Sequence, residues 1–306
     1  MATIPHGSEA RSADILNRLA ARFPVTTAVV LRTLGEPGKV QKIVVGLHDS
    51  SAIETVIIPA GTRHTVCVST QVGCRRHCSF CASGQHGWVR NLTAAEIVDQ
   101  VLLAAHHIGR RPTNVVYMGV GEPFDNYDAV MESIPAITND HGLAVGIRKI
   151  TISTSGVIPG IERLAREPLH PELSVSLHAT RDAVRDRLMP INRAYPIPDL
   201  IRACRVYTET TRRVVIFEYT LIREVNDSLQ EARELVSMLG AFPCRVNFLT
   251  LNPIPEYAES PSTRETAGMF MDLLAQNHIT AMLRESRGDA LGAACGQLRV
   301  ATTRAG

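Results

Sequence analysis

The chain has 306 residues, of which 45% are hydrophobic and 20% charged, and its formal net charge is +2. This length and composition are typical of a globular protein with one large or two modest domains, and they exclude disordered and fibrous classes. The chain contains no apolar run of about 18 residues and does not begin with a signal-peptide pattern. We therefore expect a cytoplasmic protein that does not span a membrane.

The first sixty residues predict a short helix followed by three β segments, 27–35, 39–47 and 52–60. Apolar and polar residues alternate in these segments, which indicates a small antiparallel sheet.

From residue 65 onward, β-branched runs alternate with helical patterns. The expected strands are 65–70, 114–120, 149–155, 172–179, 213–222, 244–251 and 280–286, and the clearest helices are 93–109, 228–239 and 262–278. The helix at 93–109 begins with a capping box, Thr93 followed by Glu96. This rhythm predicts an α/β fold with parallel strands and right-handed crossovers, whose ligands lie at the carboxyl ends of the strands.

Three of the seven cysteines, Cys74, Cys78 and Cys81, stand in a Cys-x3-Cys-x2-Cys motif. In a reducing compartment such cysteines suit metal ligation or reactivity better than a disulfide framework. A structural zinc ion would need a fourth ligand, for which the nearby choices are Cys67, His64, His77 or His86. A four-iron cluster held by three thiolates instead leaves one iron open to a ligand. The tight spacing favours the cluster, because one loop can wrap three of its corners.

The remaining cysteines differ in their surroundings. Cys204 lies on an apolar helical face and Cys244 opens a strand, so both are expected to serve packing. Cys295 is flanked by Gly and Ala in "GDALGAACGQL", an open setting from which a thiol could reach a buried site.

The cysteine motif, with Phe80 just before its last cysteine and an expected strand before it, resembles the radical S-adenosylmethionine (SAM) enzymes. The resemblance implies a [4Fe-4S] cluster on Cys74, Cys78 and Cys81, whose open iron binds SAM. It also implies a partial (β/α)6 barrel.

The chain resembles more closely the RlmN/Cfr group, which methylates carbon 2 or carbon 8 of an adenine in ribosomal RNA. The phrases that carry this resemblance are "CVSTQVGC", "MGVGEP", "ITISTSGV", "SVSLHA", "PINRAYP", "FEYTLIREVND", "LNPIP" and "ACGQL". They span roughly residues 50 to 298. The implied organisation is a helix and β-rich segment over 1–60, a radical SAM partial barrel over 61–290 and a tail over 291–306.

SAM-binding residues follow from the same phrases. The resemblance assigns Gly121 and Glu122 to the SAM amino end and Asn252 to the adenine; the glycine would let the backbone approach a ligand. Polar strand ends suit the ribose hydroxyls and the carboxylate, and the matching positions are Ser153, Ser176, Leu177 and His178.

The resemblance also implies three catalytic residues. Cys295 would accept a methyl group from one SAM, and a radical derived from a second SAM would take a hydrogen from that group so that it adds to the adenine carbon. Cys67 would then attack the sulfur of Cys295 in a transient disulfide and release the product. Glu54 would remove the proton from the substrate carbon.

The sequence also leads to expectations about the substrate and the partners of the protein. The resemblance implies an RNA substrate and an electron donor such as a flavodoxin or ferredoxin, and we expect a monomer. The family's usual second acid before the methyl-carrying cysteine is Ala290 here, and its "MGMGEP" has Val120. Few basic runs and only about fifty residues before the first shared phrase leave open a substrate other than ribosomal RNA, and the cysteines leave open a zinc site, so two alternatives remain. These are methylation of another RNA or a small molecule by the same chemistry, and a zinc-stabilised RNA-binding module without catalysis.

Overall fold

The computed structural model describes residues 28–85 and 87–299. The short helix predicted near the N-terminus lies outside these residues, as do residues 300–306 of the predicted tail. The three-part division of the chain at residues 60 and 290 stays a prediction. Within the described residues, no helix combines the length and apolar character needed to cross a membrane.

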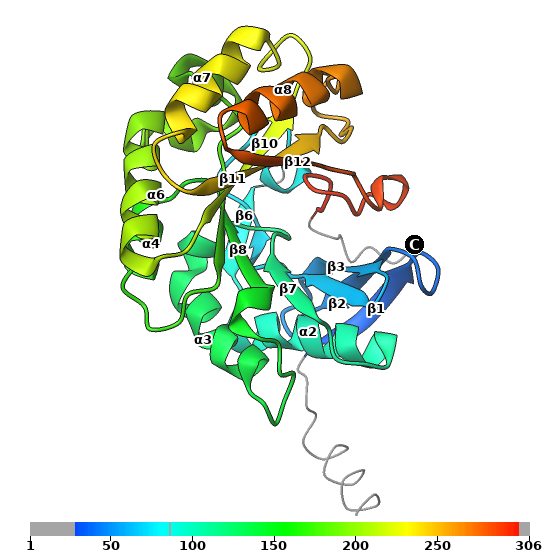
Figure 1. The fold of residues 1–306 in the computed structure, drawn as a ribbon. Coiled ribbons are helices and arrows are strands. Elements are labelled where there is room, and N and C mark those ends of the chain that lie inside the picture. Colours follow the sequence, from blue (N-terminus) through cyan, green and yellow to red (C-terminus); the bar gives the residue numbers. More distant parts are fainter. Residues whose placement is uncertain (1–27, 86, 300–306) are drawn as a thin grey trace, which may run out of the picture.

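One ten-stranded sheet organises the described chain (Figure 1). Its strands, in spatial order, are β1 (Val29–Leu34), β2 (Gln41–Gly46), β3 (Ala52–Ala60), β4 (Arg63–Cys67), β7 (Asn114–Tyr117), β8 (Ile150–Thr154), β9 (Glu172–Ser176), β10 (Val215–Leu221), β11 (Cys244–Thr250) and β12 (Thr280–Arg284). Strands β1 to β4 pair antiparallel, and every pair from β4 to β12 is parallel. All seven strands predicted after residue 65 are confirmed. The three N-terminal strands are also confirmed, and they continue the same sheet through the β3–β4 pair.

Helices cover the convex side of the curved sheet (Figure 1). They are α2 (Ala94–Ile108), α3 (Tyr127–Thr138), α4 (Ile158–Leu164), α6 (Ile197–Thr211), α7 (Leu229–Leu239) and α8 (Arg264–Gln276). The short helix α5 (Asp182–Leu188) lies instead at the carboxyl ends of β8 and β9. Short 3-10 turns lie at η1 (Ala82–Gly84), η2 (Pro123–Asn126), η3 (Ile147–Lys149), η4 (Pro190–Arg193) and η5 (Asp289–Leu291). The predicted capping box of α2 is present, and a second one, Ser228 with Glu231, starts α7. Since β1 and β12 are the two edges of the described sheet, the barrel is partial.

Alternation along the strands separates a core face from a concave face. On β8, Ile150 and Ile152 are fully buried in the core, while Ser153 points to the other side. Parallel strands in register place paired residues on the same face, and Ser176, Glu218 and Asn247 are paired across β9, β10 and β11. The concave face is therefore polar, and it is where the chemistry predicted from the sequence gathers.

Candidate active site

The three motif cysteines lie in the loop of a β-hairpin. Strands β5 (Gln71–Gly73) and β6 (Trp88–Asn91) pair antiparallel, and Cys74 follows β5 directly. The backbone N–H of Cys74 donates to the carbonyl of Gly87 at 2.9 Å, and that of Cys81 donates to the carbonyl of Cys78 at 3.2 Å. The hairpin therefore closes the loop at its base and turns its cysteines toward one another.

The donor set of this loop fits an iron–sulfur cluster. Burial raises the pKa of Cys74 to about 12 and raises that of Cys78 well above its usual range, and the neighbouring thiols add to both effects. The raised pKa values favour the protonated thiols while no metal is bound. Bound iron would instead favour the thiolates, because thiolates are the ligands of such clusters. Among residues 28–85 and 87–299, no three His, Cys, Asp or Glu side chains are arranged around a single ion. Cys74, Cys78 and Cys81 are the residues that would hold the cluster.

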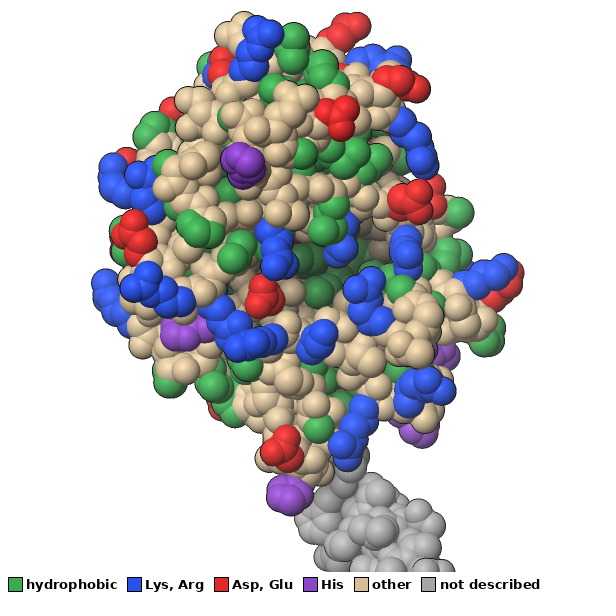
Figure 2. Space-filling view, viewed as in Figure 1, with side chains coloured by type: hydrophobic (Ala, Val, Ile, Leu, Met, Phe, Trp, Pro, Cys, Tyr) green, Lys and Arg blue, Asp and Glu red, His purple; other side chains and the backbone are tan. Residues whose placement is uncertain are grey.

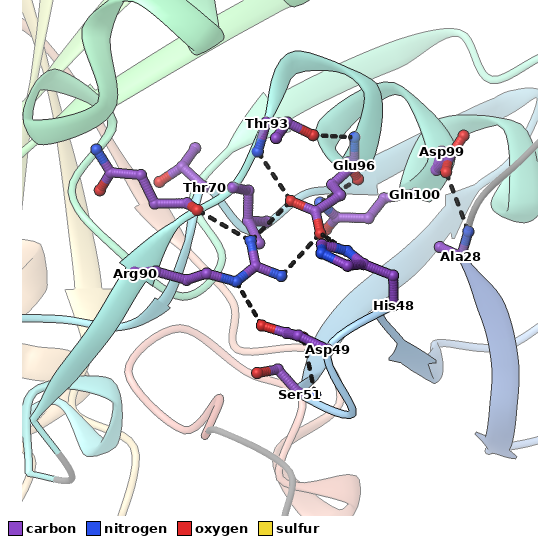
Figure 3. Close-up of polar contacts among 12 residues, drawn as sticks. Ala28, His48, Asp49, Ser51, Thr70, Arg90, Thr93, Glu96, Asp99 and Gln100 are labelled. Carbon is purple, nitrogen blue, oxygen red and sulfur yellow. Dashed lines mark hydrogen bonds and ion pairs between the residues drawn. The ribbon is translucent and has the colours of Figure 1, made fainter.

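A network of charges anchors the hairpin to the rest of the fold (Figure 3). Arg90 of β6 donates to Asp49 at 2.6 Å and to both carboxylate oxygens of Glu96 at 2.8 Å. Its hydrogen bonds hold the pKa of Asp49 well below the usual range. Glu96 also caps α2 with Thr93 and lies 3.3 Å from His48. The network thus fixes the cysteine loop against the β2–β3 turn and the start of α2.

The predicted SAM residue Glu122 is buried and bonded within the chain. Its carboxylate accepts hydrogen bonds from the backbone N–H and the hydroxyl of Ser155, both at 2.7 Å, and from the N–H of Phe124 at 3.0 Å. The carboxylate therefore joins the end of β7 to the end of β8. Its contact with the SAM amino group stays a prediction.

Gly119 and Gly121 are required by the packing of the chain itself. A Cβ atom on Gly119 would lie 2.7 Å from the hydroxyl of Ser69, and one on Gly121 would lie 2.8 Å from the hydroxyl of Thr70. The close backbone approach predicted from these glycines is present, but it is made to residues 69–71. The contact of Gly121 with SAM stays a prediction.

His178 is a buried, neutral histidine in left-handed backbone conformation, with φ of 55°. Burial, and then the charge of Arg185, lower its pKa to about 3. Its Nδ1 accepts from the N–H of Thr220 at 2.9 Å, so the proton lies on Nε2. The ring of Phe80, in the cysteine loop, packs edge-on at 4.9 Å. His178 therefore connects the end of β9 to the predicted cluster site.

The other residues predicted to bind SAM lie at neighbouring strand ends. Ser153 and Ser176 are half-buried on β8 and β9. Asn252 follows β11, and its Nδ2 donates to the carbonyl of Cys295 at 2.9 Å while its Oδ1 accepts from Ser286. Both polar atoms of the Asn252 side chain are thus engaged within the chain, so an adenine would have to replace one of these partners.

The segment that carries Cys295 is held between the cysteine loop and the N-terminal strands (Figure 1). The carbonyl of Gly296 accepts from the N–H of Ala82 in the cysteine loop at 2.7 Å, and the carbonyl of Leu298 accepts from the hydroxyl of Ser83 at 2.7 Å. On the N-terminal strands, Lys42 donates to the carbonyl of Gly292 at 3.1 Å. The end of the described chain therefore lies directly against the predicted cluster site.

Cys295 is exposed as a residue, but its thiol is enclosed by the surrounding protein. Burial, followed by the charges of Glu218 and Cys81, raises the pKa of Cys295 to about 11, while Arg284 acts in the opposite direction. Cys67 is buried at the end of β4, and burial, with Cys295 as the next contribution, raises its pKa well above the usual range. The two thiols are therefore close enough to interact electrostatically.

No disulfide is formed in the structure. All seven cysteines lie in the described residues and all are free thiols. The expectation of a disulfide bond is thus not supported by this structure, and a transient Cys67–Cys295 disulfide would need a movement of the chain. Cys204 is fully buried on α6 as predicted, and Cys244 begins β11.

Glu54, predicted as the base, is buried on β3 with both carboxylate oxygens occupied. Lys42 lies 2.8 Å from one oxygen, and the N–H of Arg299 donates to the other at 2.9 Å. Glu54 therefore ties the end of the described chain to the N-terminal strands. One of these partners must leave before it can accept a proton from a substrate.

Sequence reasoning missed two charged groups of the concave face. Glu218 on β10 accepts from Ser174 at 2.8 Å and Asn247 at 2.9 Å, and burial raises its pKa. Arg185 on α5 is completely buried and bonds the strand ends. The pattern of charged residues around Arg185 gave no signal as to which of them would point inward.

A cavity of about 370 Å³ opens beside the site, at the carboxyl ends of β10, β11 and β12. None of the residues predicted to be catalytic, cofactor-binding or metal-ligating lines it. Its lining residues are Leu221, Leu249, Thr250, Ser262, Thr263, Arg264, Ala267, Leu283, Glu285 and Ser286. The cavity is linked to the site through the hydrogen bond from Ser286 to Asn252.

Comparison with known proteins places this arrangement in a superfamily. The model of the radical SAM superfamily matches residues 68–236, which include the three motif cysteines. The structure of Streptococcus suis SuiB bound to S-adenosylmethionine shares the fold, with a TM-score of 0.55 at 16% identity.

Other relatives are much closer. A probable dual-specificity RNA methyltransferase RlmN of Moorella thermoacetica is 42% identical, with 97% of this chain and 89% of the relative aligned. Another of that name, from Desulforudis audaxviator, is 43% identical over 94% and 91% of the two chains. A crystal structure of a radical SAM methyltransferase from Sphaerobacter thermophilus is 44% identical with a TM-score of 0.88, covering 97% of this chain and 86% of that one.

The chain therefore belongs to the radical SAM superfamily and, within it, to the RlmN family. Its cofactors are accordingly a [4Fe-4S] cluster and SAM. The expected fold class is confirmed.

Proposed function

We propose that this protein methylates a ring carbon of an adenine in RNA, carbon 2 or carbon 8, with the methyl group carried on Cys295. The observation that supports this most strongly is the position of Cys295. Cys295 is an exposed residue, and the residue beside it, Gly296, is bonded to Ala82 of the cysteine loop. The names of the relatives, RNA methyltransferases, support the same substrate class.

The chemistry of adenine requires a carrier of this kind. Carbon 2 and carbon 8 are electrophilic, so direct transfer of a methyl cation from a sulfonium has the wrong polarity. When bound and reduced, the cluster supplies the electron that cleaves SAM. Cys295 accepts the methyl group beforehand by nucleophilic displacement, for which it must lose its proton. Arg284 is the nearby cation that favours its thiolate.

Release of the product is the role that we assign to Cys67. After the carbon–carbon bond has formed, the substrate is joined covalently to the sulfur of Cys295. The thiolate of Cys67 attacks that sulfur and the carbon–sulfur bond breaks, with its electron pair going to the methylene carbon, which takes up a proton and becomes the methyl group. The single electron left over from the radical addition leaves to the electron carrier, and the two sulfurs remain joined until the electron donor reduces them. The buried position of Cys67 beside Cys295 supports this assignment.

Glu54 is the proposed base for the proton on the substrate carbon. Its contact with the N–H of Arg299 places it at the segment that carries Cys295. Loss of either the Arg299 contact or the Lys42 contact would free an oxygen to accept the proton. Binding of the substrate is the event that we expect to displace one of them.

RNA is the substrate class that the surface supports. A hollow opens on the concave side, and Lys and Arg side chains gather around its rim (Figure 2). Phosphate groups bind such basic rims, and a base reaches a concave site when it leaves its stack. We expect the RNA backbone to lie on the rim with one adenine inside the hollow.

Anaerobic reconstitution of the full chain tests the proposal. We expect about four irons bound per chain and the release of 5′-deoxyadenosine on reduction with SAM. RNA incubated with this protein and then digested to nucleosides should contain 2-methyladenosine or 8-methyladenosine. Iron-free protein would exclude the proposal and favour the zinc module. SAM cleavage with methyl transfer only to a small molecule would exclude the RNA assignment.

A further inference from the structure

Arg185 forms an unusual junction beneath the site. The side chain is completely buried, and it is the largest fully buried side chain in the described protein. Its guanidinium donates to the carbonyls of Ser155 and Ser176 at 2.8 Å each, and to the carbonyl of Leu177 and the amide oxygen of Asn192 at 3.0 Å each. One side chain on α5 therefore joins the ends of β8 and β9, where the predicted SAM contacts lie.

The positive charge of Arg185 has no direct counter-charge in the described part of the chain. All four of the acceptors of its hydrogen bonds are neutral oxygens. Asp182 and Asp186 favour its charged form from a distance, and Asn192 joins them to it, because its Nδ2 donates to their carboxylates at 3.0 and 2.7 Å. Burying a charge without a partner is unfavourable, and a guanidinium does not lose its proton in proteins. A neighbouring negative charge in the functional state would offset that cost.

Cys78 is the group positioned to supply such a charge. A negative charge on the Cys78 sulfur would favour the charged form of Arg185, because the two groups lie close enough to interact electrostatically. The helix of Arg185 is also bonded to the cysteine loop, because the carbonyl of Leu188 accepts from the N–H of Ser79 at 2.9 Å. Cys78 and Phe80 pack against apolar residues of the same helix, Val184 and Leu188 among them. Helix α5 thus holds Arg185 in a fixed position relative to the cysteine loop.

Gly156 shows how closely the guanidinium is fitted. A Cβ atom at this position would lie 3.0 Å from Nη2 of Arg185, and Gly156 has φ of 105°, which side chains rarely adopt. The end of β8 therefore has no room for a side chain where it meets Arg185. The close packing around Gly156 holds the guanidinium of Arg185 in one position.

We propose that Arg185 is the buried counter-cation of the iron–sulfur site, which stabilises the reduced state of the cluster and holds the SAM-binding ends of β8 and β9. Three thiolates carry more negative charge than the resting four-iron core offsets, and each added electron increases the excess. Net charge near a cluster is one of the terms that set its reduction potential. A fixed cation beside Cys78 therefore makes reduction easier. This inference rests on the proposed function, because it requires that the cysteines hold a cluster.

Redox titration of reconstituted protein, followed by electron paramagnetic resonance, tests the proposal. Arg185→Gln removes the charge, and we expect a more negative potential and a smaller reduced fraction at a fixed solution potential. Arg187→Gln is the matched control, because Arg187 is exposed on the same helix, and it should leave the potential unchanged. Equal reduction potentials of the cluster in Arg185→Gln and wild type would overturn the electrostatic role of Arg185, but not the proposed function of the protein. A wild-type protein that binds no iron would overturn the proposed function as well.

Arg185→Lys separates charge from geometry. A lysine keeps the positive charge, but its single ammonium cannot bond all the carbonyls that the planar guanidinium reaches. We expect a potential near that of wild type and a severalfold weaker SAM affinity, measured from the change that SAM causes in the spectrum of the reduced cluster. If Arg185→Gln does not fold, Arg185→Lys decides the positioning role: weaker SAM binding supports it, and unchanged binding overturns it.

Discussion

The cysteine loop between β5 and β6 and the segment that carries Cys295 both present thiols to one site, but they are built differently. The loop is closed by a hairpin and anchored by the charges of Arg90 (Figure 3). Cys295 is exposed and stands between Gly292 and Gly296, both in left-handed conformation. Both regions are hydrogen-bonded to the rest of the fold, but only the segment of Cys295 combines an exposed cysteine with flanking glycines, which suits the proposed role of a group carrier.

The largest effect should come from removing a thiol of the fixed loop. In Cys78→Ala, two cysteines cannot hold the four-iron cluster, so iron content and 5′-deoxyadenosine release should both be lost. Iron analysis and chromatography of the products measure this. Cys204→Ala, which removes a buried thiol of α6, is the control and should keep its iron. Full iron content and SAM cleavage in Cys78→Ala would show that the loop is not the cluster site.

Removing the carrier thiol should abolish methyl transfer but leave cluster binding intact. Cys295→Ser should bind iron as wild type does but form no methylated RNA, because serine cannot carry the group through the same displacement. Iron content and nucleoside analysis are measured on the same sample. Cys244→Ser, at the start of β11, should retain methyl transfer. Methylated RNA produced by Cys295→Ser would show that Cys295 does not carry the methyl group.

A smaller loss of methyl transfer is expected when Glu54 is replaced. Glu54→Gln cannot accept a proton as a carboxylate does, so methyl transfer should fall by about 10²-fold or more while iron content is unchanged. Rates under conditions of a single turnover measure the loss. Glu36→Gln removes an exposed carboxylate from a surface ion pair and should keep the wild-type rate. If Glu54→Gln transferred the methyl group at the wild-type rate, Glu54 would not be the base, and its role would be limited to its bonds with Lys42 and Arg299.

The smallest effect is expected from the anchor of the hairpin. Arg90→Ala removes a partly buried, two-oxygen contact with Glu96 and the bond to Asp49, and should lower the free energy of unfolding by about 1–2 kcal/mol. Denaturant unfolding of the protein without cluster checks this value. Arg202→Ala, which breaks an exposed pair with Asp199, should change stability by less. Equal losses in the two variants would argue against the anchoring role.

Much of the fold and of the site was predictable from local sequence patterns. The strands followed from β-branched runs, and the start of α2 followed from Thr93 and Glu96. The cysteine spacing placed Cys74, Cys78 and Cys81 in one loop. In each case the signal lies within a few neighbouring residues, so no knowledge of the tertiary structure is needed.

What escaped prediction depends on contacts between distant segments. Glu218 meets Asn247 only because of the register between β10 and β11. Arg185 is one of three basic residues within seven positions, and only the packing of α5 decides that it is buried while Arg187 is exposed. The bonds of Asn252 to Cys295 and Ser286 join parts of the chain more than thirty residues apart. Such contacts leave no periodic mark in the sequence.

The central claim, that the methyl group passes through Cys295, can be tested most directly with SAM labelled in its methyl group. Trypsin should release residues 288–299 as one peptide in which Cys295 is the only cysteine. In cluster-loaded Cys67→Ala protein incubated with RNA, we predict that this peptide carries the label and an attached adenine nucleotide. RNA that becomes methylated by wild-type protein while Cys295 never acquires the label would contradict the account.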